Sequence, residues 1–233
     1  MATDAPARGP AVPHPRVQFV LFDGFDPLDV IAPYEVLTAG SDVLGGALDI
    51  GLVSAEGPRD VVSGITGVTL AATAALDPTA PGYVVVPGAA GPVDGDPDEI
   101  DTIPVLLSRF ATGPAAPLLR ACLDHTAVTV ATVCGGSLAL AMAGLLEGRT
   151  ATTHVLGVDL LEAAGVTAVR ARVVDDGDLV SAGGVTSGLD LGLHLLERDF
   201  GPRIAHAVEA LFEYERRGTT WRNTGLAAVE GVA

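Results

Sequence analysis

Residues 128–137 read VTVATVCGGS, and this stretch joins a strand to a helix. The β-branched and small residues over 128–133 predict a buried strand. The two glycines after Cys134 permit a sharp turn, and the apolar run over 137–146 predicts a helix. We therefore expect Cys134 on a strand-to-helix turn, with a projecting side chain and a strained backbone.

Strands and helices also alternate on the N-terminal side of this turn. Asp26 and Pro27 predict the start of a helix, with Asp26 as its N-cap, and Gly40 predicts its end. A β-branched segment over 61–70, broken by glycines, predicts a hairpin or a strand with a bulge. The other elements predicted here are strands over 17–22, 48–54 and 83–86, and helices over 103–110 and 115–125.

On the C-terminal side, Asp175-Asp176-Gly177 predicts a tight turn between two strands within 169–182. Helices are predicted over 154–164, 189–200 and 204–217. The chain shows no repeat and no linker. We therefore expect a single domain over 16–217, a disordered arm rich in proline over 1–15, and a tail over 218–233 that carries no pattern.

Several of the predicted strands are uniformly apolar, which is typical of a parallel sheet covered by helices on both faces. In such sheets ligands bind at the carboxyl ends of the strands. The strand ends to consider are Asp23-Gly24, Pro87-Gly88 and Cys134-Gly135.

The composition excludes several classes of partner. The 13 basic residues are all arginine, and against 29 acidic residues they leave a net charge of -16. A surface this acidic repels nucleic acid and anionic membranes. The uncharged run over 126–146 is long enough to span a membrane, but glycines split it, so it is interpreted as a buried strand and helix. Two cysteines and no signal peptide indicate a reducing cytoplasm.

Cys134 has two interpretations. The N–H groups of the helix that follows would favour the thiolate and lower the pKa of the thiol, as in a nucleophile. Alternatively, Cys134 is a small buried hydrophobic residue. The turn that contains Gly88 and Ala89 lies at a neighbouring strand end. It would supply a backbone N–H that acts with the N–H of Gly135 as an oxyanion hole, or it is a plain turn.

Asp29 is the acidic candidate. It occupies the third helical position after Asp26, so it either stabilises the helix end or lies beside the thiol as a proton donor with a raised pKa. His154 is a candidate base or a residue at a helix start, and Cys122 is expected in the core. No metal-ligand spacing and no nucleotide-binding fingerprint occurs, so neither a metal nor a cofactor is expected.

Five ordered motifs resemble the ThiJ/PfpI family of the class I glutamine amidotransferase-like superfamily, and the resemblance covers about residues 16–217. Within that family it is nearest to the isonitrile hydratase (cyclohexyl-isocyanide hydratase) branch. The resemblance implies a flavodoxin-like, doubly wound, mostly parallel sheet with helices on both faces, and a homodimer. The motifs are LDVIAPYEVL over 28–37, VVPG over 85–88, VCGGS over 133–137, TTH over 152–154 and GGVTSGLD over 183–190.

The resemblance also implies roles for single residues. Cys134 matches the nucleophile, Asp29 its acidic partner, and Gly88 and Gly135 the oxyanion amides. In the hydratase branch a thiolate attacks the isonitrile carbon, the carboxyl group protonates it, and water releases an N-substituted formamide from the thioimidate. The residues expected around a small-molecule substrate are His154, Ser137 and Thr186.

Two departures from the family patterns concern the residue after the nucleophile. The hydratase pattern has Thr there, whereas this chain has Gly135 with Ser137 two residues further on. The protease-like members have His there, so a peptidase is not expected. Two other functions remain open: a ligand-sensing module, as in AraC-type regulators that carry this domain, and an oxidative-stress protein, with glyoxalase-like activity included.

Overall fold

An eight-stranded sheet lies in the middle of the computed structural model, which describes residues 14–96 and 99–226. All of its pairings are parallel except that between β10 and β11. The mostly parallel sheet is therefore confirmed, whereas most of the arm predicted over 1–15 lies outside the described residues. In order across the sheet the strands are β12 (Trp221–Arg222), β10 (Val173–Asp175), β11 (Leu179–Ala182), β7 (Val128–Val133), β6 (Gly82–Val86), β1 (Arg16–Leu21), β2 (Asp49–Ser54) and β5 (Ala74–Ala75).

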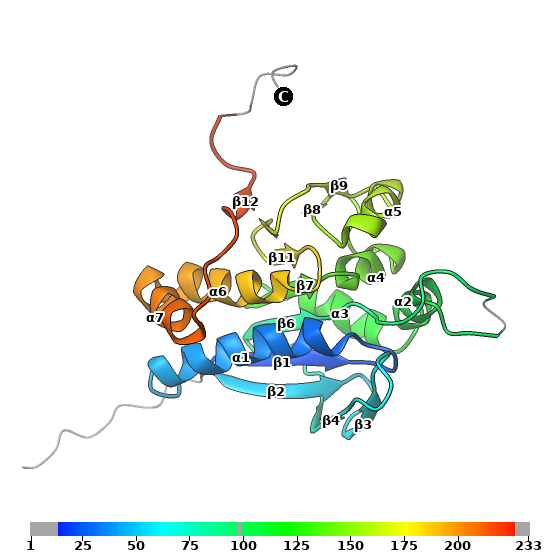
Figure 1. Cartoon of the computed structure of the whole chain (residues 1–233), viewed down its shortest axis with the longest axis horizontal. Coiled ribbons are helices and arrows are strands. Elements are labelled where there is room, and N and C mark those ends of the chain that lie inside the picture. The colour runs from blue at the N-terminus through cyan, green and yellow to red at the C-terminus, as the bar shows by residue number, and fades with distance from the viewer. Residues whose placement is uncertain (1–13, 97–98, 227–233) are drawn as a thin grey trace, which may run out of the picture.

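Helices cover both faces of the sheet, which confirms the doubly wound architecture. Figure 1 shows one group of three helices packed together in front of the sheet, and the contacts between elements agree. This group is α1 (Pro27–Val43), α6 (Ser187–Phe200) and α7 (Pro202–Phe212). The second group is α2 (Ile103–Ala111), α3 (Ala115–Asp124), α4 (Gly136–Met142) and α5 (Val158–Ala163).

Two small sheets lie outside the main one. β3 (Arg59–Val62) and β4 (Thr69–Ala72) pair antiparallel, so the hairpin predicted within 61–70 is confirmed. β8 (Thr150–Ala151) and β9 (Thr167–Ala168) pair parallel and were not predicted. The helix predicted over 154–164 is divided into a 3₁₀ turn, η1 (Val155–Gly157), and α5.

The predicted end of α1 at Gly40 is wrong, although its predicted start is confirmed. Asp26 caps the helix, because its Oδ1 accepts a hydrogen bond from the Leu28 N–H at 2.9 Å. The helix continues through Gly40 to Val43. A Cβ at Gly40 would lie 2.4 Å from Cδ2 of Leu196. Glycine therefore allows α1 and α6 to pack closely here and does not end the helix.

Two further predicted helix ends are also wrong. α4 ends at Met142, before residue 146, and α7 ends at Phe212, where Glu213 adopts a left-handed φ of 49°. After α7 the chain returns to the sheet as β12, whose Arg222 forms an ion pair with Asp175 at 2.9 Å. A strand of two residues has no periodicity from which it could have been predicted.

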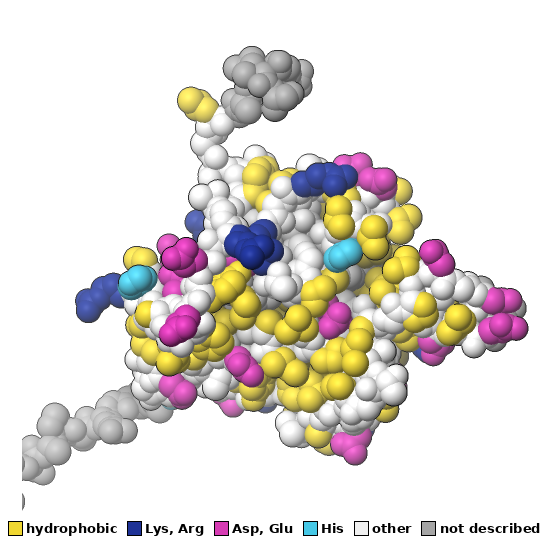
Figure 2. Space-filling model, in the orientation of Figure 1, with side chains coloured by type: hydrophobic (Ala, Val, Ile, Leu, Met, Phe, Trp, Pro, Cys, Tyr) yellow, Lys and Arg dark blue, Asp and Glu magenta, His cyan; other side chains and the backbone are white. Residues whose placement is uncertain are grey.

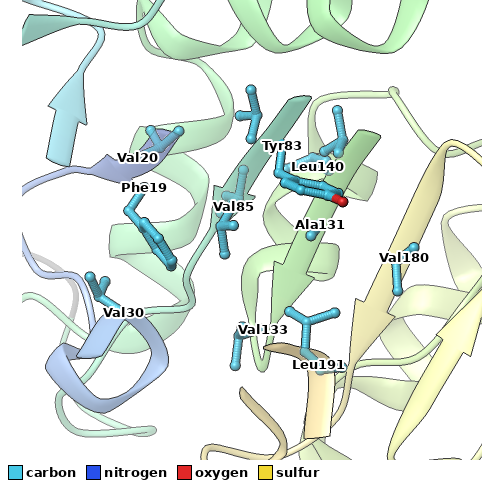
Figure 3. Close-up of a cluster of buried hydrophobic side chains, with 14 of the residues drawn as sticks. Phe19, Val20, Val30, Tyr83, Val85, Ala131, Val133, Leu140, Val180 and Leu191 are labelled. Carbon is cyan, nitrogen blue, oxygen red and sulfur yellow. The ribbon is translucent and has the colours of Figure 1, made fainter. Parts of the chain in front are cut away.

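The hydrophobic core lies between the sheet and its helices, and Figure 3 shows part of it. In this cluster the side chains of β1, β6, β7 and β11 meet those of α1, α4 and α6. The residues labelled in Figure 3 are Phe19, Val20, Val30, Tyr83, Val85, Ala131, Val133, Leu140, Val180 and Leu191.

Among the described residues, no helix has both the length and the hydropathy that crossing a membrane requires.

Candidate active site

Cys134 lies on the sharp turn between β7 and α4, with a left-handed φ of 54°. A residue other than glycine in this conformation costs on the order of 1–3 kcal/mol, so its neighbours must hold it there. The Cys134 N–H donates to the Ala182 carbonyl at 3.0 Å, and the Thr153 hydroxyl donates to the Cys134 carbonyl at 2.8 Å. The strained turn expected from the sequence is confirmed.

Glycine is required directly after this turn. A Cβ at Gly136 would lie 2.3 Å from the carbonyl oxygen of Val86, at the end of the neighbouring strand. A Cβ at Gly88 would lie 2.6 Å from the nitrogen of Gly135. The turns that follow β6 and β7 are therefore in backbone contact, as expected for neighbouring strand ends in a parallel sheet.

The thiol of Cys134 is nearly enclosed, with 8% of the residue exposed. Burial raises the pKa of the thiol well above its usual range, and the charge of Asp29 raises it further. The N–H of Gly135 acts in the opposite direction. The lowering expected from the helix N-terminus is therefore wrong for the resting protein, because α4 has only seven residues and burial outweighs it.

Asp29 lies on α1 and is completely buried. Burial raises the pKa of its carboxyl group to about 8, and the negative charge of Asp26 adds to this effect. The Gly88 N–H, which donates a hydrogen bond to the carboxyl group, and the nearby Cys134 thiol lower the pKa and only partly offset the rise. Asp29 is therefore mostly protonated at pH 7, as the proton-donor interpretation requires.

The Asp29 carboxyl group is also the point where three elements meet. Its Oδ2 accepts a hydrogen bond from the Gly88 N–H at 2.9 Å. Its Oδ1 is buried and forms no hydrogen bond of ordinary geometry with a described residue. The thiol of Cys134 is nevertheless close enough for the two groups to shift each other's pKa. Asp26, and not Asp29, caps the helix, so the carboxyl group of Asp29 remains available to the site.

The backbone amides around Asp29 differ in their hydrogen bonds. The N–H of Gly88, predicted as an oxyanion donor, is bound to Asp29. The N–H of Ala89 has no acceptor among the described residues, and the N–H of Gly135 faces the sulfur of Cys134. In this arrangement Ala89 and Gly135 remain as donors for a developing negative charge.

The three residues expected around the substrate have other contacts. His154 begins η1, and its Nδ1 accepts from the Leu156 N–H at 3.3 Å, which matches the helix-start alternative. The hydroxyl of Ser137 is fully buried and hydrogen-bonded to Thr132. Thr186 precedes α6, and its Oγ1 accepts from Arg172 at 3.2 Å. Among the described residues, none of the three is hydrogen-bonded to the Cys134 thiol.

Two residues of the site were missed. Thr153 holds the Cys134 carbonyl, and its membership of the TTH motif was the available signal. Leu107 on α2 lies over the turn, since a Cβ at Gly135 would be 3.1 Å from its Cδ1. No sequence signal distinguishes Leu107 from other apolar residues of its helix. The described part of the chain contains no group of three or more His, Cys, Asp or Glu side chains suited to a metal ion.

Comparisons with known proteins agree with this fold. The profile of the DJ-1/PfpI family matches residues 115–198. An isonitrile hydratase from Pseudomonas putida is 35% identical over 202 residues, which cover 85% of this chain and 78% of that protein. The HTH-type transcriptional regulator CdhR from Pseudomonas aeruginosa is 34% identical over 39% of this chain and 27% of its own length.

Solved structures show the same fold. A ThiJ/PfpI family protein from Pseudomonas syringae superposes with a TM-score of 0.70 at 24% identity, over 92% of this chain and 84% of that one. DJ-1beta from Drosophila melanogaster superposes with a TM-score of 0.69 at 16% identity, over 87% of this chain and 99% of that one.

Proposed function

Because this chain belongs to the DJ-1/PfpI family, we propose that it is a cysteine-dependent enzyme that hydrates a small isonitrile to an N-substituted formamide. The observation that carries the proposal is that the Cys134 thiol lies close to a buried carboxyl group with a pKa of about 8, so that each group shifts the pKa of the other. The similarity to the isonitrile hydratase of Pseudomonas putida supports the substrate class.

The first step forms a thioimidate. When the Asp29–Cys134 pair holds one proton, that proton is shared between carboxylate and thiol. With the proton on Asp29, the thiolate attacks the terminal carbon of the isonitrile and forms a C–S bond. Asp29 then transfers its proton to the same carbon and becomes a carboxylate. The addition has no leaving group, and the N–H groups of Ala89 and Gly135 are the donors available to stabilise the developing charge.

The second step releases the product. A water molecule adds to the thioimidate carbon, with Asp29 as the base that accepts a proton from it. The substrate nitrogen receives one proton, and the C–S bond breaks as the hydroxyl becomes the carbonyl of the formamide. The second proton of the water returns to the Asp29–Cys134 pair. The carboxyl group of Asp29 therefore gives a proton in one step and takes one in the other.

A role as an oxidation sensor is less well supported. Sensor cysteines are exposed thiols with a low pKa. Cys134 is 8% exposed, and burial raises the pKa of its thiol. A ligand-sensing role remains the second candidate, because the transcriptional regulator CdhR is similar over part of this chain.

The test is turnover of cyclohexyl isocyanide, measured as the formation of the N-substituted formamide. Methylglyoxal is assayed separately, as the substrate of the alternative glyoxalase-like activity. The wild type is expected to hydrate the isonitrile, with kcat/KM rising with pH up to about 8 as the pair loses its first proton. Cys134→Ser is expected to be inactive. Asp29→Asn keeps the shape without a transferable proton, so its turnover is expected to fall by a factor of roughly 100 or more.

Mass spectrometry of the wild type, quenched during turnover of the isonitrile, provides a second readout. A trapped thioimidate adds the full mass of the isonitrile at Cys134, and this adduct is expected to be absent from Cys134→Ser and weak in Asp29→Asn, which lacks the proton that forms it. Turnover of methylglyoxal alone, or of neither compound, contradicts the hydratase proposal.

A further inference from the structure

A cavity of about 300 Å³ lies at the N-terminal end of α6. Its walls come from residues 152–158, 170–172 and 183–187, and no acidic side chain of a described residue lines it. Figure 1 shows this end of α6, in yellow, at the centre of the molecule beside β11. The wall therefore carries basic side chains and no carboxylate of a described residue, in a chain with a net charge of -16.

Two arginines line the cavity, and their guanidinium groups differ in their partners. Arg172 is bound to Asp190 through its Nε at 2.8 Å and its Nη2 at 2.6 Å. Arg170 is exposed and forms no ion pair with a described residue. Figure 2 shows few basic side chains on this face of the molecule, among several acidic ones. An arginine without a carboxylate partner at a cavity wall is therefore available to an anion.

A buried hydroxyl group in the wall also lacks a partner. Ser187 is 1% exposed, and its side chain forms no hydrogen bond with a described residue. Its Oγ lies 3.7 Å from the point where a Cβ at Gly183 would be, and both residues line the cavity. Ser187 is the first residue of α6, a helix of 14 residues, whose positive end attracts negative charge.

We propose that this cavity binds a small carboxylate, which Arg170 and the hydroxyl of Ser187 hold at the N-terminus of α6. A carboxylate matches a guanidinium group with two parallel hydrogen bonds. The volume, at the lower end of the usual range for ligand sites, suits a small anion.

The cavity lies directly against the turn that carries Cys134. Thr153 lines it and donates to the Cys134 carbonyl, and Gly183 follows Ala182, whose carbonyl accepts from the Cys134 N–H. The carboxylate is therefore either a substituent of the substrate or a separate effector. Only the first case depends on the hydratase activity proposed above.

Acetate is the probe, with acetamide as its neutral counterpart, and binding is measured on the full chain by calorimetry and thermal shift. The wild type and Cys134→Ser are both expected to bind acetate and not acetamide. Arg170→Gln is expected to weaken binding about tenfold or more, and Ser187→Ala about fivefold. Arg203→Gln removes an exposed arginine on α7 and is expected to bind as the wild type does.

Kinetics with isocyanoacetate and methyl isocyanide distinguish a carboxylate that is part of the substrate from one that belongs to a separate effector. If the carboxylate belongs to the substrate, Arg170→Gln raises KM for isocyanoacetate alone. If it belongs to an effector, acetate changes the kcat/KM of the wild type for methyl isocyanide and not that of Arg170→Gln. Inactivity toward both isonitriles contradicts the hydratase proposal and leaves the acetate measurement unaffected. Equal binding of acetate and acetamide, no binding, or unchanged binding in Arg170→Gln overturns the carboxylate site.

Discussion

At the scale of single residues, the site depends on a cysteine with an unusual backbone conformation and on an aspartic acid with an unusual protonation state. The backbone of Cys134 is left-handed, and the carboxyl group of Asp29 is buried and mostly protonated at pH 7. Each departure has a stability consequence that is separate from catalysis. These consequences can be measured without any substrate.

The strain at Cys134 is tested by comparing Cys134→Gly with Cys134→Ala in urea unfolding. Glycine adopts a φ of 54° freely, so the glycine variant is expected to be at least as stable as the alanine variant. Ala131→Gly in β7 is the matched control, because glycine in a strand costs roughly 0.5–1 kcal/mol. An equal loss at both positions would mean that the turn stores no strain.

The burial of Asp29 is tested by the pH dependence of stability. The folded carboxyl group has a pKa of about 8, against 3.8 for an ordinary aspartate, so between these values the folded state binds more protons than the unfolded state. Stability contributed by the protonated group is present at low pH and is lost as pH rises toward 8. Asp29→Asn has no carboxyl group at this position and so does not lose this stability as the pH rises. The difference in free energy of unfolding, variant minus wild type, is therefore expected to increase from pH 4 to pH 8 by an amount on the order of several kcal/mol.

Asp60→Asn removes an exposed carboxyl group on β3 and serves as the control, with no comparable pH-dependent gain expected. Parallel stability curves for the wild type and Asp29→Asn would show that Asp29 is ionised throughout this range.

At the scale of elements, the site depends on how closely the turns after β6 and β7 approach each other. The two turns touch through their backbones at Gly88 and Gly135, and α1 brings Asp29 to the same point. No side chain fits between them. The approach is therefore a property of the sheet and its turns together.

Gly88→Ala tests this approach. The added Cβ would lie 2.6 Å from the Gly135 nitrogen and 2.9 Å from Asp29 Oδ2, so the backbone must shift, at a cost of roughly 1–3 kcal/mol. Loss of turnover is expected together with the loss of stability. Gly51→Ala in β2 has open space around its Cβ and is expected to be neutral or slightly stabilising in the same thermal melts. Full activity in Gly88→Ala would show that the contact is not needed.

What the sequence predicted is mostly local. The turn at Cys134 follows from the contiguous run over 128–137, and Asp26 with Pro27 fixes the start of α1. The contact of Leu107 with the turn depends on how α2 packs, which no short pattern encodes. Gly40 led to a wrong prediction of the end of α1, because glycine occurs both at helix ends and where two helices pack closely. The pairing of Asp29 with Cys134 was a prediction from the resemblance. No sequence pattern indicated that the N–H of Gly88 donates a hydrogen bond to Asp29.

At the scale of the whole molecule, the net charge of -16 governs association. Two copies of this chain repel each other, and salt screens the repulsion over about 10 Å at 0.1 M. We expect a homodimer at physiological salt, with a mass twice that of the 23.5 kDa chain in light scattering. The dimer is expected to weaken as the ionic strength falls. A monomer at every salt concentration contradicts this prediction.

The two outermost strands of the sheet, β5 and β12, have only two residues each. An open strand edge is a template on which a further chain can add, and that is the usual beginning of aggregation. Here β12 covers two of the three residues of β10, and β5 covers the last two of the six residues of β2. Each outermost strand is therefore too short to be a good template for a further strand. Loss of β12 would remove this protection on one side by exposing the edge of β10.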